Sequence, residues 1–132
     1  MKFKMILLVS VGILFISCKA TISKLSERNN AKEAKIQIKN MVKGAMQYKL
    51  DQGTLPGDCW ETLLEYGYIE ITEPVIDFWE FECSWDWDQS DYRMVGTVYA
   101  TSTHRNAAGP GNVIEYYIEE DSFYGYGQRN EE

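Results

Sequence analysis

Apolar residues between positions 31 and 50 recur with the period of an α-helix. Their spacings are four, three, four and three, which places them along one side of a helix. Asn29 or Asn30 can cap its start, and Glu33 near the first turn suits the helix dipole. The pattern predicts a long helix that ends near Leu50. Its apolar stripe is formed by Ala34, Ile38, Met41, Ala45 and Tyr48.

A basic ridge follows another side of this helix. Its members recur at spacings of three, four and four residues, so they share one face. They are Lys32, Lys35, Lys39 and Lys43. Such a ridge is either a solvated face or a surface that meets lipid or an acidic partner.

A loop and a short second helix should follow. Gly53 and the Pro56-Gly57 pair break the first helix. Asp58 stands three residues before Glu61, which is a capping-box spacing with Asp in place of Ser or Thr. The second helix should end at Gly67, which can adopt the left-handed conformation of a helix end.

The clearest strand lies at 79–87, where apolar and polar residues alternate without error. This period of two gives one aromatic face and one acidic face. Segments 92–101, 113–119 and 122–126 predict further strands, and the Gly109-Pro110-Gly111 segment predicts a loop. The apolar stripe of the helix can cover the apolar face of the sheet. The sequence therefore predicts an α+β fold, with a long N-terminal helix packed on a small antiparallel sheet of three or four strands.

The first eighteen residues have the order of an export signal. A start with two lysines precedes an apolar run at 5–16, and Ser17 precedes Cys18. The run is shorter than the roughly 20 residues of a spanning helix. The segment resembles the lipobox of bacterial lipoproteins, with Phe15 where Leu is usual, which implies that Cys18 is acylated and becomes the new N-terminus. An ordinary signal peptide or an uncleaved anchor is the alternative.

This resemblance implies three segments: a signal peptide at 1–17, a polar tether at 18–30 and a folded domain at 31–132. Acyl chains on Cys18 would anchor an exported protein at the cell envelope. Lys19 stands where Gram-negative lipoproteins retained in the inner membrane carry Asp, so for a Gram-negative source the outer membrane is favoured.

Cysteine count and charge add two expectations. Lipidation of Cys18 leaves Cys59 and Cys83, which predicts a disulfide in an oxidising compartment, with two buried free thiols as the alternative. Residues 1–50 hold ten Lys and Arg against two Glu, whereas the rest holds three Arg against eighteen carboxylates. The acidic part argues against nucleic acid as a partner.

The helix end and the start of the sheet carry a recognisable set of residues. The set comprises Tyr48, Asp51, Gly53, Pro56, Asp77 and Trp79. From Ala34 to about Phe81 the chain resembles the globular domains of type IV pilins and of type II secretion pseudopilins, whose first helix typically ends in Tyr, an acidic residue, Gly and Pro. The resemblance implies a pilin-like head and protein partners in a pilus or a secretion apparatus.

Two departures from the family limit this implication. Pilins carry a Glu five residues into a long apolar helix that packs the filament core, whereas this chain has no such Glu and has a lipobox there. At Phe78 and Glu80 the family's Pro and Gly are missing, so the calcium-holding loops of some pseudopilins are not implied. We therefore do not expect the chain to polymerise as an ordinary pilin does.

Catalytic and metal-binding patterns are weak. The single histidine, His104, has no obvious nucleophile near it in the sequence, so we expect no enzyme and no cofactor. Asp86, Asp88, Ser90 and Asp91 have the spacing of a calcium loop but lack its central Gly and distant Glu, which predicts a solvated turn without a metal.

Aromatic residues leave one alternative function open. The alternation assigns Trp79 and Trp85 to the core and leaves Trp87, Tyr124 and Tyr126 as candidates for exposure. Exposed rings beside carboxylates can stack on a sugar or a peptide. A docking head and an aromatic ligand-binding module of the envelope are thus the two leading hypotheses, and a small hydrolase is disfavoured.

Overall fold

The computed structural model describes residues 2–128, with side chains from Ser26 to Gln128. Three helices precede four strands along the chain, which confirms the predicted α+β class. The elements are α1 (Lys2–Gln52), α2 (Glu61–Glu65), α3 (Glu73–Phe78), β1 (Trp79–Asp88), β2 (Arg93–Ser102), β3 (Val113–Tyr117) and β4 (Ser122–Gly125).

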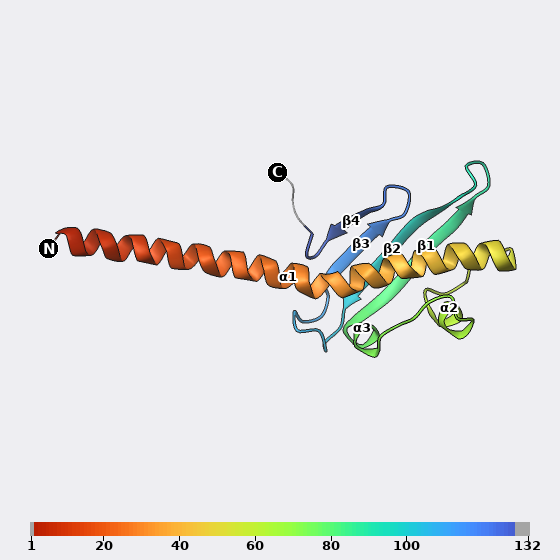
Figure 1. Cartoon of the computed structure of the whole chain (residues 1–132), viewed down its shortest axis with the longest axis horizontal. Coiled ribbons are helices and arrows are strands. Elements are labelled where there is room, and N and C mark those ends of the chain that lie inside the picture. Colours follow the sequence, from red (N-terminus) through yellow and green to blue (C-terminus); the bar gives the residue numbers. More distant parts are fainter. Residues whose placement is uncertain (1, 129–132) are drawn as a thin grey trace.

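The four strands form one antiparallel sheet in the order β1-β2-β3-β4. Each strand therefore pairs with the next one along the chain, and short connections suffice. The second half of α1 lies across the sheet, and its first half extends beyond the sheet (Figure 1). Together the sheet, the second half of α1 and the two short helices make up the head of the molecule.

The core lies between α1 and the inner face of the sheet, as the two patterns predict. Ile38 and Met41 of α1 are fully buried, and so are Val98 and Ile114 of the sheet. Trp79 is only 3% exposed. Partly buried side chains of β1 pack against this core, namely those of Phe81, Cys83 and Trp85. The aromatic face of β1 is therefore core, as predicted.

The predicted start of the long helix is wrong. Asn29 and Asn30 lie inside α1 and do not cap it, because α1 is continuous from Lys2. The Asn30 amide instead donates to Asn106 Oδ1 at 2.7 Å, which fixes this turn of the helix to the head. Ala31, directly after it, is fully buried. Tertiary contacts thus override the local capping preference of Asn.

The proposed anchor precedes the part of the chain whose side chains the structure describes. The side chains of residues 2–25, including that of Cys18, lie outside the described set. The division at residues 17 and 30 therefore stays a prediction, although the backbone of segment 18–30 is helical. Among the described residues no helix has the length and apolar character needed to cross a membrane.

Two details of the connection between α1 and β1 differ from the prediction. Helix α3 was not predicted, although Thr72 at its N-cap and a Pro in its first turn are recognisable signals. At α2 the N-cap residue is Trp60, and the Asp58 carboxylate accepts from the backbone N–H of Thr62 at 3.0 Å. Asp58 thus satisfies an N–H of the first turn, but without the predicted Asp-Glu capping box.

Gly44 lets α1 approach the connection closely. A Cβ at this position would lie 2.5 Å from Ile69 Cγ2 and 3.3 Å from the Tyr68 carbonyl oxygen. We expect Gly44→Ala to lower the free energy of unfolding by about 1–3 kcal/mol despite the better helix propensity of Ala. Urea denaturation followed by circular dichroism measures this change.

A matched control is Gly57→Ala. A Cβ at Gly57 meets no atom within 4 Å. Its stability should stay within about 0.5 kcal/mol of the wild-type value. Equal stabilities of the Gly44→Ala and Gly57→Ala variants would show that close packing is not the reason for glycine in α1.

Candidate functional site

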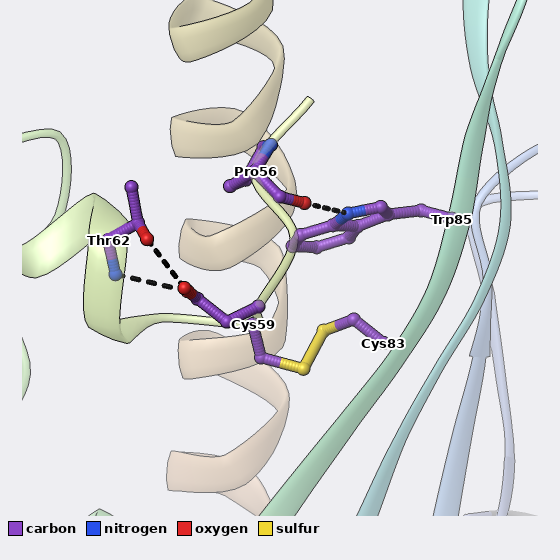
Figure 2. Close-up of a disulfide and its surroundings, with 6 residues drawn as sticks. Pro56, Cys59, Thr62, Cys83 and Trp85 are labelled. Carbon is purple, nitrogen blue, oxygen red and sulfur yellow. Dashed lines mark hydrogen bonds between the residues drawn. A yellow bond between two sulfur atoms is a disulfide. The ribbon is translucent and has the colours of Figure 1, made fainter. Parts of the chain in front are cut away.

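A disulfide ties the loop before α2 to the first strand. Cys59 and Cys83 are bonded, with their Cα atoms 5.4 Å apart, which confirms the predicted pair. Next to it, Trp85 Nε1 donates to the Pro56 carbonyl oxygen at 3.2 Å (Figure 2). Because the two links lie side by side, they hold the loop against the inner face of β1.

The motif residues at the end of α1 form a local joint. The Tyr68 hydroxyl donates to the Asp51 carboxylate at 2.9 Å, and the Tyr48 and Tyr68 rings meet edge to face at 5.5 Å. Gly53 has a φ of +87° and donates its N–H to the Lys49 carbonyl oxygen, which ends the helix. These contacts give Tyr48, Asp51 and Gly53 a structural role.

The second part of the motif stabilises the start of the sheet. The Asp77 carboxylate lies 3.7 Å from Arg105, and the Asp77 carbonyl oxygen accepts from the Thr103 hydroxyl. The buried Asn106 donates to the Phe78 carbonyl oxygen at 3.0 Å. The motif residues therefore lie at separate joints of the fold and do not converge on one site. Asn106, which reaches both α1 and the end of α3, was missed because its partners are 28 and 76 residues away.

The residues that the sequence suggested for catalysis or metal binding lie in a loop and around a turn of the sheet. His104 is exposed in the loop after β2. Within residues 26–128 no group of three or more His, Cys, Asp or Glu side chains is arranged to hold a metal ion. The Asp88 carboxylate accepts from the backbone N–H of Ser90 at 2.9 Å and of Asp91 at 3.3 Å, so it organises the β1–β2 turn.

Exposed aromatic rings are spread over separate elements. Three exposed rings lie on different elements: Tyr66 directly after α2, Phe78 at the end of α3, and Tyr92 in the β1–β2 turn. Tyr124 is also exposed, as expected, but Trp87 and Tyr126 are half-buried against the core, so their predicted exposure is wrong. Trp87 is covered because the Tyr92 ring meets it at 5.3 Å.

The outer face of the sheet nevertheless gathers tyrosines and carboxylates, and we call this surface the tyrosine face. The strand register places Glu82, Tyr99, Glu115 and Tyr124 in one row across the four strands. Tyr117 lies beside this row, with its ring 5.2 Å from the Tyr124 ring. The sequence could not show this row, because it depends on the register of three strand pairs.

Hydrogen bonds fix two of these rings in place. The Tyr117 hydroxyl donates to Glu115 at 3.1 Å, and the Tyr124 hydroxyl donates to Glu120 at 2.9 Å. Each bond to a carboxylate raises the pKa of its phenol further above physiological pH, where a tyrosine is already neutral. The tyrosine face is thus a polar aromatic surface with negative charge.

On the opposite side of the sheet, Asp121 links the β3–β4 turn to α1. Its carboxylate accepts from the Tyr116 hydroxyl and lies 3.4 Å from the Lys39 ammonium. The hydrogen bond, followed by the charge of Lys39, lowers the pKa of Asp121. Burial and the same carboxylate raise the pKa of Tyr116 to about 12.

This link predicts a pH dependence. The pKa of Asp121 is lower in the folded than in the unfolded chain, so its contribution is present above the unfolded value of about 3.9 and is lost as pH falls through the folded value. Asp121→Asn, which keeps a residue tolerant of the observed positive φ, should remove that contribution. Melting temperatures from pH 6 to pH 2 should fall less steeply for the variant. Parallel curves would contradict the link.

No protein-family model, curated protein or solved structure matches this chain. The head offers surfaces of opposite charge, namely the basic side of α1 and the tyrosine face. Such an arrangement suits binding to other molecules.

Proposed function

We propose that this chain is an exported, membrane-anchored protein whose pilin-like head has a structural or interaction role in a pilus or a secretion apparatus. One observation carries the proposal. The second half of α1 lies across a four-stranded antiparallel sheet, while its first half extends from the head (Figure 1). The part of this first half that follows residue 17 would form a short stem between the head and its attachment point.

The anchor in this proposal is the lipobox cysteine. Removal of residues 1–17 would leave Cys18 as an acylated N-terminus at the envelope, and Lys19 favours the outer membrane. The buried Ala31 follows Cys18 by thirteen positions, which along a helix correspond to roughly 20 Å. The head would then lie just beyond the lipid head groups.

The contacts of the head support an interaction role over catalysis. Three of the candidate motif residues accept hydrogen bonds at separate joints of the fold, from Tyr68, Trp85 and Thr103. The surfaces between these joints carry charge and exposed rings. A docking head needs such surfaces and a rigid fold, and the disulfide contributes to that rigidity.

A second candidate function is supported by the tyrosine face. Tyr99, Tyr117 and Tyr124 lie on one side of the sheet with carboxylates beside them. Neutral rings next to hydrogen-bonding carboxylates suit a glycan or a basic peptide. On this hypothesis the protein is a ligand-binding module of the envelope.

Photo-crosslinking in cells tests the two candidates. A photoreactive residue would be placed singly at Tyr66, beyond the end of α2, and at Tyr124 on the tyrosine face. The proposed function predicts crosslinks from at least one position to protein components of a filament or a secretion assembly. Absence of such crosslinks, together with saturable glycan binding that Tyr124→Ala abolishes, would favour the second candidate.

A further inference from the structure

A basic pocket lies between α1 and the segment around β4. It has a volume of about 620 Å³. Its lining includes four cationic side chains and two apolar ones, namely Arg28, Lys32, Lys35, Lys39, Ile36 and Phe123. Three members of the predicted basic ridge, Lys32, Lys35 and Lys39, therefore form one wall of a concave surface.

The positive charge of this pocket is mostly uncompensated. Among the described residues, only Lys39 of the four cations has a carboxylate within 4 Å, which is that of Asp121. Glu27 and Glu33 lie in the same stretch of α1 but outside the lining, because each is about 100° or more around the helix from both Lys32 and Lys39. A ligand of this pocket should therefore carry negative charge.

Apolar groups in the pocket indicate that the ligand is more than a small anion. Ile36 is 46% exposed although it stands among lysines. The Phe123 ring lies beneath Lys35, with the ammonium 4.8 Å from the ring centroid. A free phosphate would use the cations alone. Cations combined with exposed apolar side chains are typical of a surface that lies at the lipid interface.

The position of the pocket agrees with a lipid ligand. Arg28 follows Cys18 by ten residues, which corresponds to about 15 Å along a helix. The pocket therefore lies at the end of the head nearest to the proposed anchor, within reach of the head-group region if α1 is tilted. This step depends on the proposed function.

We propose that the basic pocket binds the head group of an anionic phospholipid in the membrane that anchors the chain. The phosphate contacts Arg28 and Lys32, and the glycerol and first acyl carbons contact Ile36 and Phe123. A lipid bound in this way holds the side of α1 against the bilayer. The tyrosine face, on the other side of the sheet, then points away from the lipid.

Native mass spectrometry of the full chain tests this proposal. The chain is purified in a neutral detergent and titrated with phosphatidylglycerol or phosphatidylcholine, and bound lipid is counted. The wild-type chain should retain phosphatidylglycerol preferentially. Arg28→Gln with Lys32→Gln should weaken that binding roughly thirtyfold, because two charges that face an anionic group are lost. Equal retention by the wild-type and variant chains would overturn the proposal.

Two further variants distinguish a bound lipid from a bound free anion. Lys43→Gln with Lys49→Gln removes the same charge from α1 outside this pocket and should change retention by less than about threefold. Ile36→Ser keeps all charges and should weaken phosphatidylglycerol binding severalfold without affecting displacement by inorganic phosphate. A pocket emptied by millimolar phosphate and unaffected by Ile36→Ser would be a free-anion site, against the proposal.

The same spectra report the proposed anchor independently. The mass of the chain shows whether Cys18 is acylated. Selective lipid retention by an unacylated chain would support the pocket and contradict the anchor. An acylated chain without selectivity would contradict the pocket alone.

Discussion

Replacing Cys59 and Cys83 by alanine should lower the free energy of unfolding by roughly 3 to 4 kcal/mol. The two cysteines are 24 residues apart, and opening a loop of this length restores that much chain entropy to the unfolded state. The effect is large because a domain of this size is stable by only about 5–15 kcal/mol. Urea denaturation at neutral pH measures it.

The reduced wild-type chain is the natural control for this variant. With the disulfide reduced, it should unfold at nearly the same urea concentration as the double alanine variant. The oxidised wild-type chain should unfold at a clearly higher concentration. If oxidised and reduced chains unfold together, the loop before α2 is held by packing and by the bond from Trp85 to Pro56, and the disulfide adds little.

Ile38→Ala should destabilise the head by about 2–5 kcal/mol. Ile38 is fully buried on the side of α1 that faces the sheet, so its truncation leaves a cavity next to the core residues of the strands. The m-value should stay unchanged, because the variant exposes a similar area on unfolding. Urea denaturation followed by tryptophan fluorescence measures both quantities.

Ile36→Ala is a matched control on the same helix. It removes the same atoms two residues away, but Ile36 is half exposed on the opposite side of α1. Its free energy of unfolding should change by less than about 1 kcal/mol. Similar losses for Ile36→Ala and Ile38→Ala would mean that α1 does not lie on the sheet by the face that carries Ile38.

Periodic segments could be predicted well from the sequence. The alternation at 79–87 matches β1 to within one residue, because a half-buried strand imposes a period of two on its side chains. The stripe through Ile38 and Met41 matches the buried side of α1 for the same kind of reason. The disulfide followed from the number of cysteines left once Cys18 is assigned to the lipobox.

Features that depend on distant contacts could not be predicted. Asn30 looks like a helix cap, yet it lies within α1 and its amide bonds to Asn106 instead. Tyr126 looks exposed near the C-terminus, yet its ring lies 6.1 Å from Trp79. Gly44 looks like a weak point in a helix, yet it lies against Ile69. In each case the deciding partner is at least 25 residues away.

The candidate surfaces, too, combine features that the sequence could predict with features that depend on distant contacts. The lysine ridge was visible as a helical period, but the pocket needs Phe123 from β4 as its second wall. The tyrosine face needs the register between β2, β3 and β4. Helical period is a local property of the sequence, whereas a surface shared by several elements is fixed only by the fold.

Anchoring at Cys18 is central to the function proposed for this chain. The mass of the N-terminal peptide, measured on protein extracted from its native membranes, tests it most directly. We predict the loss of residues 1–17 and a diacyl or triacyl group on Cys18. A peptide that begins at Met1, or one with an unmodified Cys18 thiol, would contradict the lipid anchor and the orientation of the head that follows from it.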